Sequence, residues 1–192
     1  MTILLTKPGD NVDLTKAAGG TLTNARIALG WDQRKSAGDK FDLDASIIGC
    51  GGNQRSAGAD WFVFYNRLKS PGDAIVHQGD ERTGETEGDD EQILVDFTKV
   101  PDSVTELAIA ITIHDAAQRS QHFGLVDNAY VRVINEADGA ELVRYNLSED
   151  GSGYNTVVVG RAFRADGGWC FESMFDGSTT ELQGLVDKYQ IA

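Results

Sequence analysis

The sequence has few of the residues that bind soft metals or phosphates. Its 192 residues include two cysteines, three histidines and three prolines, and 17 Lys and Arg stand against 30 Asp and Glu. Cys50 and Cys170 form no Cys-x-x-Cys pair, so we expect two small buried side chains rather than a disulfide or a zinc site. The formal net charge of −13 argues against a nucleic-acid partner, because phosphate binding depends on Lys and Arg.

Long hydrophobic runs are also missing. No stretch approaches the ~18 consecutive apolar residues of a membrane span, and Met1–Asp10 lacks the apolar core of a signal peptide. We therefore expect a cytoplasmic protein without direct membrane insertion.

Glycine is abundant, with 22 residues, and the hydrophobic pattern mostly has a period of two. The longest alternating run covers residues 107–113, which predicts a β-strand. The dipeptides Asp138-Gly139 and Asp166-Gly167 each separate two such runs and predict β-hairpins. Residues 61–65 are apolar on both faces, which predicts a central, fully covered strand.

Two segments have helical patterns. Ser178 and Glu181 form a capping-box pattern, and hydrophobic residues then recur at helical spacing from Leu182 to Tyr189. Residues 115–126 fit a short helix or a structured loop. We therefore predict an all-β fold: a β-sandwich of two mostly antiparallel sheets, with one or two short helices including one at the C-terminus. We expect one domain over residues 1–192.

The negative charge is concentrated in Asp80–Glu91. This window holds seven carboxylates and one arginine, a net charge of −6, which leaves −7 for the other residues. An exposed acidic loop is the simplest interpretation. However, Asp89, Asp90 and Glu91 directly precede a predicted strand, and like charges held close together cost free energy unless a cation neutralises them.

A second acidic cluster lies at Asp42–Ser46. A period of two places Asp42, Asp44 and Ser46 on one face, opposite to Leu43 and Ala45. Carboxylate and hydroxyl oxygens are the donors that Ca²⁺ prefers, although the spacing is not that of an EF-hand. The two clusters leave both a cation site and a solvated acidic surface open.

Several ordered motifs give the chain a family resemblance. The strings Gly30-Trp31-Asp32, Phe41-Asp42-Leu43-Asp44-Ala45-Ser46, Gly79–Gly84 and Gly88-Asp89-Asp90-Glu91 occur in this order, followed by residues 123–132 and 142–147. From about Leu4 to Tyr189 the sequence resembles the TerD family of bacterial tellurite-resistance and stress proteins.

This resemblance implies a β-sandwich that binds about two Ca²⁺ ions in acidic loops at one end. It also implies calcium-dependent assembly with protein partners of the tellurite-resistance system, including a membrane-associated complex. The metal ligands that it implies are Asp32, Asp42, Asp44, Asp80, Asp89, Asp90 and Glu91. Asp32 is matched by its place in Gly30-Trp31-Asp32, and Glu81 departs from the Asn or Asp of many relatives.

We expect no enzymatic activity and no catalytic residues. The sequence lacks a Walker A loop, a G-x-S-x-G elbow and an H-E-x-x-H helix. His114-Asp115 with His122 suggests a triad, but no nucleophile is placed with them. Two alternatives remain: an interaction scaffold in which Ca²⁺ is only structural, and a hydrolase that uses paired carboxylates.

Overall fold

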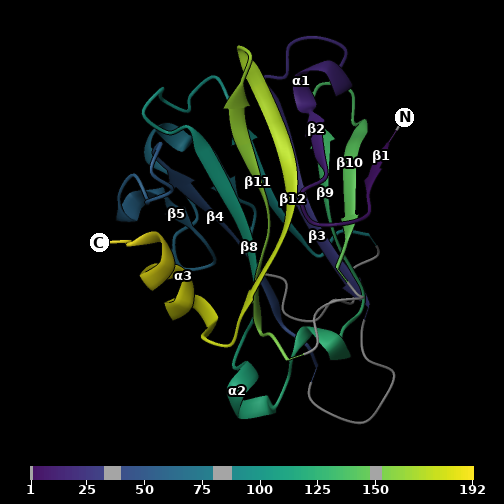
Figure 1. Ribbon diagram of the computed structural model, residues 1–192, viewed down its shortest axis with the longest axis vertical. Coiled ribbons are helices and arrows are strands. Elements are labelled where there is room, and N and C mark those ends of the chain that lie inside the picture. The colour runs from purple at the N-terminus through teal and green to yellow at the C-terminus, as the bar shows by residue number, and fades with distance from the viewer. Residues whose placement is uncertain (1, 33–39, 80–87, 148–152) are drawn as a thin grey trace.

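Two six-stranded sheets pack face to face in the computed structural model of the chain, which describes residues 2–32, 40–79, 88–147 and 153–192 (Figure 1). Sheet A has the order β1 (Ile3–Leu5), β10 (Glu141–Asn146), β9 (Asp127–Asn135), β3 (Asn24–Asp32), β7 (Glu91–Asp96) and β6 (Ile75–His77). Sheet B has the order β2 (Asn11–Asp13), β12 (Gly168–Ser178), β11 (Thr156–Ala165), β8 (Glu106–Ile113), β4 (Leu43–Cys50) and β5 (Phe62–Val63).

The strand pairing is antiparallel throughout the named strands of both sheets, except that β1 runs parallel to β10. The two predicted hairpins are confirmed as β9–β10 and β11–β12. The helices are short: α1 (Leu14–Ala17), α2 (Ala116–Arg119) and α3 (Glu181–Tyr189), with 3-10 turns η1 (Ala59–Trp61), η2 (Pro71–Asp73) and η3 (Phe123–Leu125). The predicted sandwich with a C-terminal helix is therefore confirmed.

The main core lies between the sheets, and β8 shows how the sequence pattern builds it. Leu107, Ile109, Ile111 and Ile113 of β8 belong to this core. Ala108 and Ala110 alternate with them and belong to a second cluster on the outer face of sheet B, where α3 contributes Leu185 and Tyr189. Because alanine is small, the helix can approach this face closely, and every residue of β8 is buried.

The predicted central strand at residues 61–65 is wrong. Only Phe62 and Val63 form a strand, β5, and it is an edge strand of sheet B. Val63 packs in the main core, whereas Phe62 packs in the cluster beneath α3. An edge strand is thus apolar on both faces here because a helix covers its outer side.

The C-terminal helix also begins differently from the predicted capping box. Ser178 is the last residue of β12, and the helix N-cap is Thr180, which makes no capping hydrogen bond with its side chain. The Glu181 backbone N–H instead donates to Asn155 Oδ1 at 3.3 Å. Strand β12 therefore runs almost directly into α3, which lies beside the outer face of sheet B (Figure 1).

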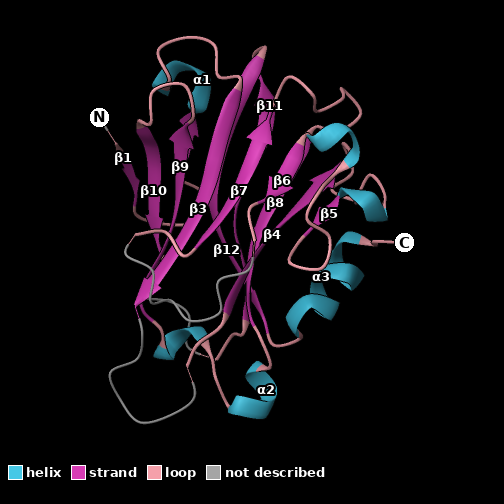
Figure 2. Cartoon of the chain, turned by 180° about the vertical axis from the view of Figure 1, so that it is seen from behind, coloured by secondary structure: helices cyan, strands magenta, loops and turns pink. Residues whose placement is uncertain are grey.

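The outer face of sheet A is less covered. Figure 2, which views the molecule from the opposite side to Figure 1, shows β10, β9, β3 and β7 with none of α1, α2 and α3 lying across them. Along most of β9, exposed or half-buried residues alternate with buried ones. Its last three residues, Val133, Ile134 and Asn135, are all buried. This alternation is typical of a sheet with one solvated face.

Candidate functional site

Asp42 and Asp44 lie at the start of β4, as the period of two predicts. Leu43 and Ala45 belong to the main core, so the alternating Asp44 faces the outer side of sheet B. Asp42 and Asp44 are nonetheless 5% and 3% exposed. The following turn of β8 closes over them: the His114 backbone N–H donates to the Asp42 carbonyl at 2.8 Å, and His114 Nδ1 lies 3.6 Å from Asp44 Oδ2.

Asp90 and Glu91 lie at the start of β7, in sheet A. Asp90 Oδ2 accepts a hydrogen bond from the Trp31 backbone N–H at 2.9 Å. Glu91 Oε2 accepts one from the Ala45 backbone N–H of β4 at 2.6 Å and lies 3.6 Å from His77 Nε2. The Glu91 carboxylate therefore joins sheet A to sheet B and places the starts of β7 and β4 at the same end of the sandwich.

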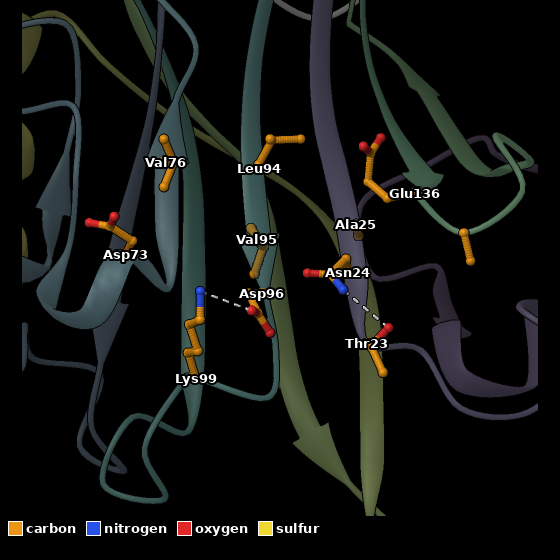
Figure 3. A pocket seen from close by; sticks show the side chains of 11 residues that line it. Thr23, Asn24, Ala25, Asp73, Val76, Leu94, Val95, Asp96, Lys99 and Glu136 are labelled. Carbon is orange, nitrogen blue, oxygen red and sulfur yellow. Dashed lines mark hydrogen bonds and ion pairs between the residues drawn. The ribbon is translucent and has the colours of Figure 1, made fainter.

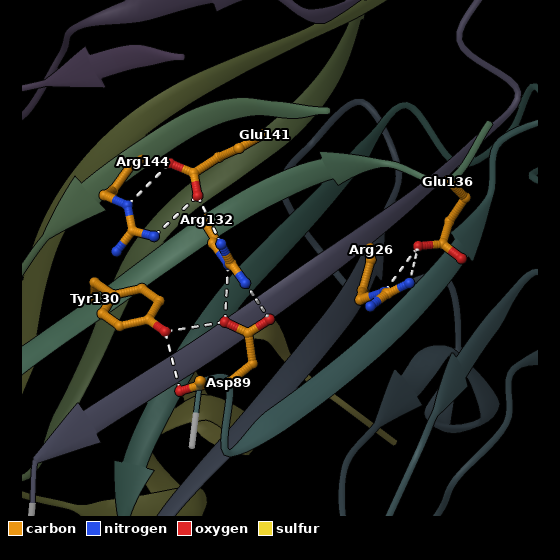
Figure 4. A network of polar contacts seen from close by, with 8 residues as sticks. Arg26, Asp89, Tyr130, Arg132, Glu136, Glu141 and Arg144 are labelled. Carbon is orange, nitrogen blue, oxygen red and sulfur yellow. Dashed lines mark hydrogen bonds and ion pairs between the residues drawn. The ribbon is translucent and has the colours of Figure 1, made fainter. Parts of the chain in front are cut away.

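Asp89 points elsewhere, to the outer face of sheet A (Figure 4). Its carboxylate accepts hydrogen bonds from Arg132 Nε and Nη2, both at 2.8 Å, and from the Tyr130 hydroxyl at 3.0 Å. Arg132 also donates to Glu141 at 2.8 Å, and the Arg144 guanidinium lies 4.1 Å from the centre of the Tyr130 ring. Asp89 is thus held in a network of ion pairs.

The electrostatics of this network follow from its hydrogen bonds and from its partial burial. The hydrogen bond to Asp89 raises the pKa of Arg132, and burial followed by the Asp89 charge raises the pKa of Tyr130 to about 12. The hydrogen bond from Arg144 holds the pKa of Glu141 below its usual range. Arg132 is not among the site residues predicted from the sequence, although its alternation with Val131 and Val133 is the signal that places it on the solvated face.

The remaining predicted ligands have another partner or lie outside the described residues. Asp32, the last residue of β3, is exposed and accepts a hydrogen bond from Asn128 Nδ2 at 2.6 Å. Asp80 lies outside the described residues. The structure thus brings Asp42, Asp44, Asp90 and Glu91 to one end, and gives Asp89 and Asp32 other partners.

The four buried carboxylates have the chemistry that a hard divalent cation needs, namely oxygen donors removed from water. Within the described ranges, no three His, Cys, Asp or Glu side chains are grouped closely enough to hold a metal ion. Complete coordination would therefore need backbone carbonyl oxygens, water or donors outside these ranges. The role of each predicted ligand remains a prediction.

A cavity of about 330 Å³ on the outer face of sheet A is separate from this end (Figure 3). Asn24, Val76 and Leu94 line it together with Asp96 and Lys99, whose side chains form an ion pair at 3.3 Å. None of the predicted metal ligands lines this cavity. Three carboxylates line it, and each has an ion-pair partner: Asp96 pairs with Lys99, Asp73 with Lys69 and Glu136 with Arg26. The cavity therefore suggests no specific chemistry.

The fold and the buried acidic end define a two-sheet β-sandwich with a candidate cation site. The family model of the TerD domain matches residues 1–189, so the chain belongs to the TerD family. The chain is 41% identical over 190 residues to general stress protein 16U of Bacillus subtilis, covering 98% of this chain and 97% of that protein. It is 39% identical over 191 residues to tellurium resistance protein TerD of Serratia marcescens, covering 100% of this chain and 98% of that protein.

The solved structures agree on the fold. A homologue of telluride resistance protein (TerD) from Streptomyces coelicolor A3(2) superposes with a TM-score of 0.69 at 20% identity, covering 86% of this chain and 95% of the other. Among the described residues, no helix is long and apolar enough to cross a membrane.

Proposed function

We propose that this protein is a non-enzymatic, calcium-binding member of the tellurite-resistance and stress-response family. It binds about two Ca²⁺ ions at the acidic end of the sandwich. Asp42, Asp44, Asp90 and Glu91 would hold them, and Asp80, Asp32 and Asp89 complete the predicted ligand set. The observation that carries this proposal is the burial of four carboxylates, from both sheets, at one end of the molecule.

The physical reason is the cost of burying charge. Asp90 and Glu91 are 9% and 1% exposed, and Asp42 and Asp44 are similarly buried. An ionised carboxylate removed from water costs several kcal/mol unless hydrogen bonds and an opposite charge offset that cost. The hydrogen bonds from Trp31 and Ala45 offset part of it. Bound calcium would supply the opposite charge, and these carboxylates, from the starts of β4 and β7, would coordinate it.

This arrangement would couple calcium to the tertiary structure. Glu91 of β7 accepts a hydrogen bond from the backbone of β4. Calcium that offsets the negative charge of the carboxylates would therefore stabilise the contact between the two sheets. Two ions would change the formal net charge from −13 to −13 + 4 = −9. We propose that the end stabilised in this way presents a surface for protein partners of the tellurite-resistance system, including a membrane-associated complex, in the cytoplasm.

Calorimetric titration of chelator-treated protein with Ca²⁺ tests the binding. We expect a stoichiometry of about two and a melting temperature that rises with calcium, because a ligand specific for the native state stabilises it by RT ln(1 + [L]/Kd). Asp90→Asn and Asp44→Asn should each weaken binding, whereas Asp96→Asn, a carboxylate ion-paired with Lys99 on the same sheet as Asp90, should not. An unchanged melting temperature at millimolar Ca²⁺ would contradict the proposal.

A scaffold with purely structural calcium is the second candidate, favoured by the contact between Glu91 and Ala45 across the two sheets. In a pull-down with a candidate partner, Asp44→Asn plus Asp90→Asn should lower stability but leave capture intact if calcium is only structural. Loss of capture by a folded double variant would instead identify calcium as a switch. Asp90 and Glu91 accept hydrogen bonds from backbone N–H groups. This arrangement does not favour a carboxylate-dependent hydrolase.

A further inference from the structure

A cavity of about 390 Å³ lies between the outer face of sheet B and the start of α3. Its volume falls within the range of small-molecule sites, roughly 300–1,000 Å³. Side chains from β4, β8, the turn after β8, the segment after β5 and α3 surround it. The residues that matter here are Asp44, Tyr65, Thr112, Asp115, Glu181 and Leu182.

The walls of this cavity are acidic. Asp44, Asp115 and Glu181 come from three different elements and all line it. Asp115 Oδ2 lies 3.7 Å from His114 Nε2 and 3.6 Å from Arg119 Nη2, and Glu181 Oε1 accepts a hydrogen bond from the Ala117 backbone N–H at 3.1 Å. Arg119 offsets one of these three charges, and the remaining negative charge around one concave surface creates a potential that favours a positively charged ligand.

A buried hydroxyl gives an independent indication of a ligand. Thr112 lines the cavity and is 1% exposed, yet its Oγ1 has no hydrogen-bond partner within the part of the chain that the structure describes. Buried polar atoms in proteins nearly always have a partner, so such an atom calls for an explanation. A ligand with N–H donors would satisfy Thr112 Oγ1.

The shape and the apolar walls favour an organic ligand over a metal ion. The cavity has room for far more than one ion, and no three His, Cys, Asp or Glu side chains are grouped for a metal within the described ranges. Tyr65 and Leu182 provide apolar surface beside the acids. An aromatic ring also attracts cations through its π face.

We infer that this cavity binds a small organic ammonium ion. Its N–H groups would donate to the carboxylates of Asp115 and Glu181 and to Thr112 Oγ1, while its alkyl part packs against Tyr65 and Leu182. This inference goes beyond calcium binding and does not depend on it, although Asp44 borders both sites. The ammonium group belongs either to a free amine or to a lysine side chain of a partner.

Two substitutions test the site with little risk to the fold. Asp115→Asn removes one charge, and asparagine tolerates the left-handed conformation that Asp115 adopts, with φ of 53°. Thr112→Val removes only the hydroxyl and keeps the branched shape that suits a strand. Asp73→Asn is the matched control, because Asp73 is a carboxylate that lines the other cavity, on the outer face of sheet A.

The full chain would be titrated with n-butylammonium in the presence of a calcium chelator, followed by calorimetry and by amide NMR shifts of Thr112, His114 and Leu182. We expect saturable binding, with n-butanol and butyrate at least tenfold weaker. Asp115→Asn should weaken binding by about tenfold and Thr112→Val by several-fold, the losses typical of one hydrogen bond with a charged group. Asp73→Asn should bind like the unaltered protein.

The proposal fails if n-butylammonium does not bind at millimolar concentration, if n-butanol binds equally well, or if both substitutions leave binding unchanged. Tighter binding of Nα-acetyl-lysinamide than of n-butylammonium would assign the ammonium group to a protein lysine, and weaker binding would assign it to a free amine. Because calcium is chelated, a failed calcium titration does not affect this result. Equally, loss of amine binding leaves the calcium proposal standing.

Discussion

The ion-pair network around Arg132 gives a prediction that concerns both stability and the metal site. Arg132→Met keeps the aliphatic stem of the side chain but removes its charge and its hydrogen bonds to Asp89 and Glu141. Asp89 would then keep the hydroxyl of Tyr130, and Glu141 would keep Arg144. The substitution therefore isolates the contribution of one guanidinium group.

The magnitude follows from the unequal burial of the two ends of the pair. The Asp89 side chain is 3% exposed and the Arg132 side chain is 26% exposed. Removing one partner of a fully buried pair costs about 3–5 kcal/mol, whereas exposed pairs contribute about 0–1 kcal/mol. With one partner buried and the other partly solvated, we expect the free energy of unfolding to fall by about 2–3 kcal/mol.

Urea unfolding of the unaltered protein, Arg132→Met, Asp89→Asn and the double variant measures this value and the coupling between the two residues. We expect a coupling of about 1–2 kcal/mol, within the range found for residues in one network. A loss below about 0.5 kcal/mol, typical of surface substitutions, would refute the reasoning. Calcium titration of Arg132→Met adds a second result: its affinity should rise if Asp89 is a calcium ligand, because Arg132 no longer competes for that carboxylate.

Two further predictions concern α3 and the alkaline pH dependence. Leu185→Ala should lower the free energy of unfolding by about 2–5 kcal/mol in urea, because Leu185 of α3 packs against sheet B and is 2% exposed, whereas Leu4→Ala, at a 56% exposed residue, should change it little. Equal losses would contradict the packing of α3 on sheet B. The pKa of Tyr130 is about 12 in the folded protein against an ordinary 10.0, so the folded state retains its proton where the unfolded chain has lost it. Stability should therefore fall as pH rises from about 10 to 12, and Tyr130→Phe should flatten that part of the profile; an unchanged slope would contradict this assignment.

The sequence predicted the strands whose burial is local in origin. The alternation in β8 and the Asp-Gly turns of the β9–β10 and β11–β12 hairpins depend on residues that are neighbours in the chain. The period of two at Asp42–Ser46 also gave the correct faces for Leu43 and Ala45. The position of β5 could not be predicted in this way, because its outer side is covered by α3, more than a hundred residues later.

For the candidate site, the sequence determined the residue types and the two acidic segments that supply them. Adjacency in sequence suggested that Asp89, Asp90 and Glu91 act together, but the tertiary structure separates them. Asp89 pairs with Arg132 on the outer face of sheet A, Asp90 accepts from the Trp31 backbone, and Glu91 reaches β4 of the other sheet. The physical reason is that successive side chains at the start of a strand point in different directions, so their partners come from strands that only the packed sheets bring near.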